Sequence, residues 1–315
     1  MLKVDLVTGF LGSGKTTFIQ KYLHYLKSRD QKVHIIENEF GAVNADRKIL
    51  ESEDQVSISD LTGVCMCCKG QRMFSNMLLE SAAAGNDRCI VEPSGIYDVD
   101  EFFETMKQFA IKESCEIGSI ITVVDAHFIE TLSDESLYLM FSQLLAGGII
   151  VLSKTQLFEY EIEATIEKLN DMMTSRGCSK IAPERIIAKD WNDFTDDDFE
   201  KIMNSGYHIE EHDRNYMSHD EVFETKELAQ FCKDEEDLKE RLHNLFTNHE
   251  RFGNIIRVKG HIRDFNKKWL EINCTPDVIS IRPANIKRGL FIVIGQNMNS
   301  DAVKAAFLSK EDLPQ

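Results

Sequence analysis

The sequence predicts an α/β protein: a first domain built on a mostly parallel sheet, followed by a smaller α+β C-terminal domain. Three observations carry this prediction. Short, continuous apolar segments alternate with helical segments over roughly the first 190 residues. A glycine-rich loop joins the first apolar segment to the first helical one. Beyond an acidic stretch, several further strand-like segments are bracketed by two helices, which is typical of a small α+β domain.

The apolar segments of the first part have the character of strands buried on both faces. Each is rich in β-branched residues and ends near a polar residue, as strands of a parallel sheet do. The segment at 15–28 differs, because Phe18, Tyr22 and Leu26 recur at helical spacing and predict an amphipathic helix. The predicted strands are residues 2–7, 32–37, 88–92, 118–125, 147–153 and 184–188.

An acidic stretch separates the two predicted domains. Between Asp190 and Glu221 stand eleven acidic residues against two basic ones, together with His208, His212 and His219. We interpret residues 206–220 as a linker between a first domain at 1–205 and a second at 221–315. Its composition is compatible with a solvated acidic connection or with a weak auxiliary metal site at the histidines.

The second domain is predicted from its own pattern of strands and helices. An amphipathic helix is expected at 234–248, and a closing helix at 300–310. Several β-rich segments lie around and between them, without any internal repeat. The expected strands are residues 222–228, 255–262, 269–275, 278–283 and 289–296.

Charge and hydropathy narrow the class of function. The 315 residues carry a net charge of −17, which disfavours non-specific binding to nucleic acid or to an anionic membrane surface, because both require a basic footprint. No apolar run reaches 18 residues, so no transmembrane helix is expected. The N-terminal residues lead directly into a strand and lack the features of a signal peptide. We therefore expect a cytoplasmic protein without nucleic-acid or membrane partners.

The loop "GFLGSGKT" at residues 9–16 fits the pattern G-x-x-x-x-G-K-[ST] and lies between a strand and a helix, where a phosphate-binding loop must lie. Its backbone N–H groups would converge on phosphates at a helix N-terminus. Lys15 would reach the β- and γ-phosphates, and the Thr16 hydroxyl would bind Mg²⁺. The first domain is thus predicted to be a P-loop NTPase domain. The predicted phosphate site comprises Gly9, Gly12, Ser13, Gly14, Lys15, Thr16 and Thr17.

A second motif is the cysteine loop "DLTGVCMCCKG" at residues 60–70, with Cys65, Cys67 and Cys68. A disulfide, a closed structural zinc site, a redox centre and a metal-transfer site are all compatible with three clustered thiols. A reducing compartment disfavours the disulfide, and a closed zinc site normally has four protein ligands. Three thiolates favour zinc or another thiophilic ion such as Cu(I), with one coordination position left open. The other five cysteines are isolated in or near apolar segments and are expected in the core.

In combination, the motifs resemble the CobW-like metal-handling GTPases. The resemblance rests on "TGFLGSGKTT", "IENEFG" followed by Asp46, the C-x-C-C loop and "VEPSG", in that order. It continues through "IIRVKGHI", "WLEIN" and "FIVIGQNMNSDAVKAAF" in the C-terminal part, and so spans nearly the whole chain.

The resemblance implies further site residues. "NEFG" with Asp46 resembles the first switch region, in which Glu39 and Asp46 would hold Mg²⁺ or its waters and orient the attacking water. In "VEPSG", Glu92 would end a buried strand beside Mg²⁺, and the Gly95 N–H would meet the γ-phosphate. Phosphoryl transfer requires little more than a metal, a positioned water and fixed donors.

The predicted base-binding segment departs from the family pattern. Related GTPases carry Asn-Lys-x-Asp after an apolar strand, whereas this chain has Ser153, Lys154, Thr155 and Gln156. Lys154 can still lie along the base, but Gln156 offers a neutral amide oxygen in place of a carboxylate. Charge-assisted hydrogen bonds are roughly twice as strong as neutral ones. GTP is the expected nucleotide by resemblance, and ATP or weak base discrimination stays open.

The function that the resemblance implies is a GTP-hydrolysing metallochaperone that delivers zinc, or a similar ion, to a client metalloprotein; it could act as a homodimer. Two other classes are compatible with the same motifs. One is a regulatory protein that binds metal and nucleotide with negligible turnover. The other is a P-loop small-molecule kinase, although the sequence carries no signature of an acceptor pocket or a nucleotide lid.

Overall fold

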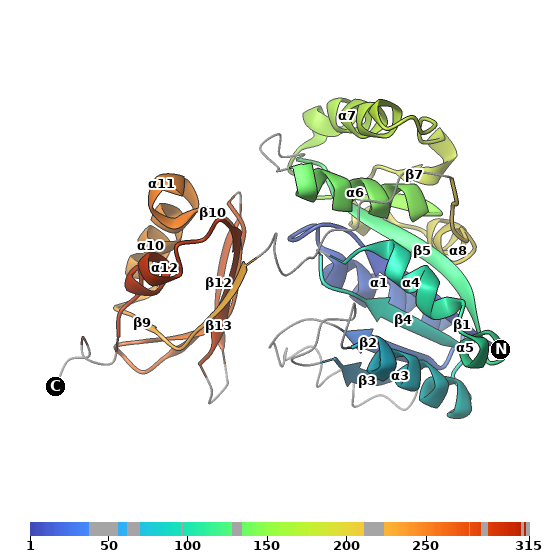
Figure 1. The fold of residues 1–315 in the computed structure, drawn as a ribbon, viewed down its shortest axis with the longest axis horizontal. Coiled ribbons are helices and arrows are strands. Elements are labelled where there is room, and N and C mark those ends of the chain that lie inside the picture. The colour runs from blue at the N-terminus through green and yellow to red at the C-terminus, as the bar shows by residue number, and fades with distance from the viewer. Residues whose placement is uncertain are drawn as a thin grey trace. The chain divides into compact units, whose positions relative to one another are not determined.

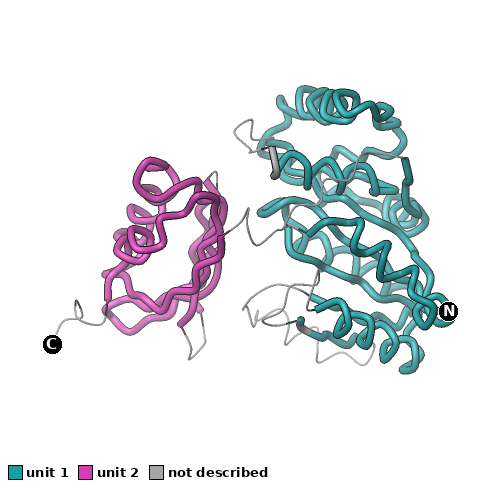
Figure 2. Tube along the Cα trace, viewed as in Figure 1, with its two compact units in different colours: residues 1–39, 43–215 teal, residues 40–42, 216–315 magenta. Residues whose placement is uncertain are grey.

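The computed structural model describes residues 1–37, 56–61, 70–95, 97–127, 134–210, 224–276, 278–284, 289–309 and 312. The chain forms two compact units, coloured separately in Figure 2. Unit 1 comprises residues 1–39 and 43–215, and unit 2 comprises residues 40–42 and 216–315. Each unit has its own sheet and its own buried core.

Unit 1 contains a seven-stranded sheet in the order β3-β2-β4-β1-β5-β6-β7, in which every pair of neighbours is parallel. The predicted parallel sheet is thus confirmed. The sequence pattern missed one strand, β3, which is short, lies at the sheet edge and alternates Val and Ile with Ser. The strands are β1 Leu2–Thr8, β2 Val33–Glu37, β3 Val56–Asp60, β4 Arg88–Glu92, β5 Cys115–Asp125, β6 Ile149–Ser153 and β7 Ile186–Ile187.

Helices cover both faces of this sheet (Figure 1). One core cluster joins a sheet face to α3, α4 and α5, and another joins the opposite face to α1 and α8. Because side chains alternate along a strand, β1 contributes Leu6 to the first cluster and Val7 to the second. The helices are α1 Lys15–Ser28, α3 Gln71–Ala83, α4 Val99–Met106, α5 Phe109–Lys112, α6 Asp134–Ala146, α7 Ile162–Ser175 and α8 Asp196–Met203.

Helix α1 follows the predicted pattern closely. Phe18, Tyr22 and Leu26 are fully buried at four-residue intervals, so one stripe of the helix faces the sheet. Gly14, in the left-handed backbone region, precedes its first residue. The phosphate-binding loop therefore passes directly into a helix that the core holds in place.

The acidic stretch is partly explained by a helix terminus. Thr195 caps α8, and its hydroxyl and backbone form a capping box with Asp198, while the first turn carries three aspartates. Acidic side chains are favourable at the positive end of a helix dipole. Further along, the His208 N–H donates to the Ala146 carbonyl at 3.0 Å, so the described start of the predicted linker contacts unit 1. Residues 211–223 lie outside the described part of the chain, and the exact domain boundaries stay a prediction.

Unit 2 contains a largely antiparallel sheet in the order β12-β11-β10-β13-β8, with the short strand β9 pairing in parallel with β10. Helices lie along one face of this sheet (Figure 1), and their apolar side chains form a single core with it. The predicted α+β class is confirmed; β9 was not anticipated. The elements are β8 Glu224–Leu228, β9 Phe231–Cys232, α10 Glu235–Thr247, α11 His249–Phe252, β10 Asn254–Asp264, β11 Trp269–Cys274, β12 Ile279–Ala284, β13 Phe291–Gln296 and α12 Ser300–Ala305.

Among the helices that the structure describes, none has the length and apolar character needed to cross a membrane.

Candidate functional site

The loop between β1 and α1 has a backbone that requires glycine. Gly9, Gly12 and Gly14 have φ angles of 142°, 79° and 96°, in the region that L side chains rarely adopt. A Cβ on Gly9 would also lie 2.2 Å from the Val123 carbonyl oxygen of β5. Backbone conformation therefore explains the three glycines of the sequence motif, and close packing against β5 is a second reason at Gly9.

The ammonium group of Lys15 is hydrogen-bonded to backbone carbonyls of the same loop. The Lys15 side chain is buried, and its Nζ donates to the Gly9 carbonyl at 2.8 Å and to the Phe10 carbonyl at 3.4 Å. Ser13 is also buried, and its hydroxyl has no hydrogen-bond partner among the described residues. Thr17 lies exposed on the first turn of α1. A positive charge and an unpaired hydroxyl thus accompany the N-terminus of α1.

The two predicted magnesium-side residues meet in the structure. The Thr16 hydroxyl, at the start of α1, donates to Oε1 of Glu92 at 2.8 Å, although the residues are 76 positions apart. Glu92 ends β4 and is 3% exposed. In the sheet register, Glu37 at the end of β2 lies beside Glu92, and Asp60 at the end of β3 lies beside Glu37. The Glu92 carboxylate and the Thr16 hydroxyl are oxygen ligands of the kind that Mg²⁺ binds, so this pair fits that ion.

Gly95 lies against the phosphate-binding loop. A Cβ at this position would be 2.6 Å from the Leu11 backbone nitrogen. The segment that follows β4 therefore approaches the loop backbone more closely than any other residue type would permit. Gln143 of α6 also contacts the residues after β4. Its Nε2 donates to the Gly95 carbonyl at 3.2 Å and to the Tyr97 carbonyl at 3.3 Å. Gln143 was not predicted from the sequence, because it lies in a largely apolar helical segment and belongs to none of the motifs.

The predicted base-binding segment follows β6. Lys154 has a φ of 57°, and its ammonium forms an ion pair with the Asp125 carboxylate at the end of β5. Gln156 is exposed in the loop that leads to α7. The hydroxyls of Ser153 and Thr155 are buried and have no hydrogen-bond partner among the described residues.

Trp191 borders this region from the loop before α8. Its indole N–H donates to the Leu152 carbonyl at 2.8 Å. A Cβ on Gly14 would lie 3.3 Å from the edge of its ring and 3.7 Å from the Ser153 Cβ. Neither Trp191 nor Asp125 was anticipated from the sequence, because neither lies within a short, recognisable sequence motif.

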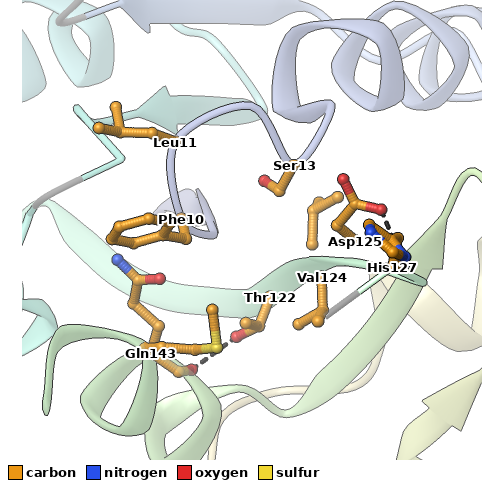
Figure 3. Close-up of a pocket in the computed structure, with 10 residues that line it drawn as sticks. Phe10, Leu11, Ser13, Thr122, Val124, Asp125, His127 and Gln143 are labelled. Carbon is orange, nitrogen blue, oxygen red and sulfur yellow. Dashed lines mark hydrogen bonds between the residues drawn. The ribbon is translucent and has the colours of Figure 1, made fainter. Parts of the chain in front are cut away.

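A pocket lies beside the phosphate-binding loop, between that loop, β5 and α6 (Figure 3). Phe10, Leu11 and Ser13 border it on one side, and Gln143 on another. The Thr122 hydroxyl of β5 donates to the Gln143 backbone carbonyl at 2.6 Å, which ties α6 to the sheet at this point. The pocket thus adjoins both the loop and the side chain that holds the segment after β4.

Five of the predicted site residues lie outside the part of the chain that the structure describes: Glu39, Asp46, Cys65, Cys67 and Cys68. Within the described part, no group of three or more His, Cys, Asp or Glu side chains could hold a metal ion. The five other cysteines are buried, as expected. Burial raises the pKa of Cys274 to about 11 and, together with nearby aspartates, that of Cys232 to about 12, so both stay protonated near neutral pH. A thiol must lose its proton to bind a metal well.

The model of the CobW/HypB/UreG nucleotide-binding domain matches residues 3–179, which is more than half of the chain. Three relatives illustrate the similarity. The zinc chaperone CobW of Pseudomonas aeruginosa is 33% identical over 135 residues, which cover 40% of this chain and 36% of that protein. The zinc chaperone YjiA of Escherichia coli is 30% identical over 182 residues, covering 55% and 54%. The zinc-regulated GTPase metalloprotein activator 1 of Saccharomyces cerevisiae is 32% identical over 146 residues, covering 43% and 33%.

The chain thus spans between about a third and a half of the length of these relatives. The matched region contains β1 except its first residue, the phosphate-binding loop, Glu92, Gly95 and the segment after β6, which together form the site described above. The chain belongs to the CobW/HypB/UreG family through this nucleotide-binding domain.

Proposed function

We propose that this protein hydrolyses a nucleoside triphosphate, with GTP as the leading nucleotide. The observation that carries the proposal is the hydrogen bond from Thr16 to Glu92, which joins the phosphate-binding loop to the end of β4. Nucleotide hydrolysis needs a magnesium ion beside the β- and γ-phosphates, and these two side chains offer the matching oxygens. The bound ion would neutralise charge on the phosphates.

Each residue of the site has a distinct part in this proposal. Lys15 contacts the β- and γ-phosphates, and the loop N–H groups from Gly12 to Thr17 bind the remaining phosphate oxygens. The Gly95 N–H donates to the γ-phosphate. Glu39 and Asp46, in the first switch region, orient the attacking water. Charge stabilisation by fixed donors supplies most of the rate enhancement in such a site.

The segment proposed to bind the nucleotide base departs from the pattern of related GTPases. We assign Lys154 to the base plane, where its pairing with Asp125 fixes the position of its stem. Gln156 supplies a neutral acceptor in place of the usual carboxylate. The proposal therefore includes a weaker preference for guanine than a carboxylate would give, and ATP use is one outcome of the test.

We further propose that Cys65, Cys67 and Cys68 bind zinc, or a similar thiophilic ion, as cargo for a client metalloprotein. Two observations support this. The loop that carries these cysteines follows β3, whose carboxyl end lies at the same edge of the sheet as Glu37 and Glu92. Two of the relatives are named zinc chaperones, and a third is named a zinc-regulated GTPase activator. Three thiolates leave a coordination position for a ligand of the receiving protein.

We propose that the two sites are coupled, so that nucleotide state and metal occupancy bias one another. The position of the cysteine loop in the chain, between the first switch region and β4, supports this. Such coupling is reciprocal: if GTP tightens metal binding by a given factor, metal tightens GTP binding by the same factor. We propose that the protein loads metal in one nucleotide state and releases it to its client, in the cytoplasm, after hydrolysis.

Hydrolysis is tested by phosphate release from GTP and from ATP with Mg²⁺ present, with and without zinc. Turnover that requires Thr16 and Glu92 is expected. Tight nucleotide binding without phosphate release, at saturating nucleotide and zinc, would instead identify a regulatory binding protein. Transfer of the γ-phosphate to a small molecule other than water would identify a kinase.

Zinc binding is tested by chelator competition, in GTP and in GDP, on the wild-type protein and on Cys67→Ala. The isolated, buried Cys178 provides the matched control Cys178→Ala. Loss of zinc affinity only in Cys67→Ala, and a difference between the two nucleotide states, are expected. Equal zinc affinities in both states would disprove the coupling, and unchanged affinity in Cys67→Ala would disprove the site.

A further inference from the structure

We infer that Gln143 is a positioning residue for the γ-phosphate: it fixes the segment after β4 so that the Gly95 N–H meets this phosphate. The inference rests on the proposed nucleotide function and adds a residue from a helix that none of the sequence motifs includes. Gln143 lies on α6 and is completely buried. Its side-chain amide donates hydrogen bonds to the Gly95 and Tyr97 carbonyls.

The first step of the argument is the geometry of the contact. One amide nitrogen, Nε2, serves two backbone carbonyls, those of Gly95 and Tyr97, and a side-chain amide has two N–H groups with which to do so. Gly95 and Tyr97 are thereby both held by a single side chain. On its other side, Gly95 is in close contact with Leu11 of the phosphate-binding loop. Gly95 is therefore clamped between α6 and the loop.

The second step concerns the anchor of the clamp. The backbone carbonyl of Gln143 accepts a hydrogen bond from the Thr122 hydroxyl at 2.6 Å, and Thr122 lies on β5, a strand next to β1. Helix α6 is thus fixed to the sheet at the residue that reaches out to Gly95. A contact held by the sheet on one side and by the loop on the other can keep a peptide N–H in one orientation.

The third step concerns the unfavourable free energy of burying the Gln143 side-chain amide. Oε1 of Gln143 is buried and has no hydrogen-bond partner among the described residues. A buried, unpaired acceptor is unfavourable, and a methionine of similar size would fill the same space without it. Core packing therefore does not account for a glutamine here, whereas the two bonds that its nitrogen donates do. The unpaired oxygen borders the same pocket as the Ser13 hydroxyl (Figure 3).

The experiment compares binding of a diphosphate and a triphosphate. Because Gln143 acts through Gly95, its loss should affect only the nucleotide that carries a γ-phosphate. We expect Gln143→Met to lower affinity for a non-hydrolysable GTP analogue about tenfold, and to change GDP affinity less than about twofold. Gln143→Glu, which places carboxylate oxygens against two carbonyls, should lower triphosphate affinity further. The neighbouring substitution Ser142→Ala, which removes only a hydrogen bond within α6, should leave both affinities unchanged.

Equal losses for GDP and for the triphosphate analogue, or no loss for either, would overturn the assignment. A second measurement works without nucleotide: amide hydrogen exchange at Ser94, Gly95 and Tyr97 should accelerate in both Gln143 variants, while exchange in α3 stays unchanged. Unchanged exchange at Ser94, Gly95 and Tyr97 would also overturn the assignment. Failure of the proposed function has a different signature, because the wild-type protein itself would then bind the triphosphate no better than the diphosphate and release no phosphate.

Discussion

The Thr16 hydroxyl donates a 2.8 Å hydrogen bond to the carboxylate of Glu92. Thr16 lies in the first turn of the first helix, and Glu92 ends a buried strand 76 positions later. Their meeting turns two separate sequence motifs into one site, because β4 lies next to β1 in the sheet. A buried carboxylate with a hydroxyl partner offers oxygen ligands to a divalent cation. The N-terminus of the helix favours the phosphates that such a cation accompanies.

The first prediction concerns Glu92. Glu92→Gln keeps an oxygen within reach of Thr16 but removes the charge that would hold the cation. We expect the rate of phosphate release to fall about 100-fold, since one lost charge-stabilising group typically costs that much. The control is Glu116→Gln, which alters an exposed carboxylate on β5. A variant with full activity at every Mg²⁺ concentration would remove Glu92 from the site.

The second prediction concerns the contact between Gly95 and Leu11. Gly95→Ala places a Cβ 2.6 Å from a backbone nitrogen, so the segment or the loop must shift. We expect a loss of about 1–3 kcal/mol in unfolding free energy, together with weaker binding of a triphosphate analogue. Gly85→Ala is the comparison, because Gly85 has a φ of 73° and open space around it. It should lose about 1 kcal/mol through backbone strain alone and bind nucleotide normally; identical nucleotide binding in both variants would contradict the prediction.

A third prediction addresses the choice of base. Gln156→Asp restores a carboxylate in the segment after β6, and the exposed position should tolerate the change without loss of stability. We expect the preference for GTP over ATP to rise on the order of tenfold to a hundredfold, as a charge-assisted pair replaces a neutral one. Competition binding of the two nucleotides measures this ratio. Gln156→Asn serves as the neutral control, and an equal ratio in Asp and Asn variants would exclude this position from base recognition.

The fourth prediction concerns pH and Glu101, in the first turn of α4. Burial and the nearby Asp98 raise the pKa of Glu101 from 4.5 to about 7. The folded state therefore keeps a proton that the unfolded state releases between these two values, so the free energy of unfolding decreases as pH rises from about 4.5 to 7. Glu101 is only partly buried, and after screening by solvent the decrease should be roughly 1–2 kcal/mol.

Urea unfolding across this pH range tests the prediction on Glu101→Gln, whose stability should depend less on pH than that of the wild type. The exposed, ion-paired Glu104 supplies the control Glu104→Gln, which should keep the wild-type slope. A Glu101→Gln variant with the full wild-type pH dependence would assign the effect to another group.

Several features were predictable because their signals are local. The phosphate-binding loop requires glycines, a lysine and a threonine within eight consecutive residues. Helix α1 repeats its buried residues every four positions, and the central strands are continuous apolar runs. The edge strand β3 escaped prediction because serines interrupt its apolar residues, and β9 because two residues leave no pattern.

The sequence by itself determined the family, the two-part organisation and the identity of the residues at the phosphate-binding loop, since these depend on local spacing and on the order of motifs along the chain. Only the tertiary structure decided which distant side chains meet: Thr16 with Glu92, Lys154 with Asp125, and Gln143 with the Gly95 segment. The physical reason is that strand order is set by the packing of the whole sheet. Residues 29 to 76 positions apart become neighbours only when the order β4-β1-β5-β6 brings their strand ends to one edge.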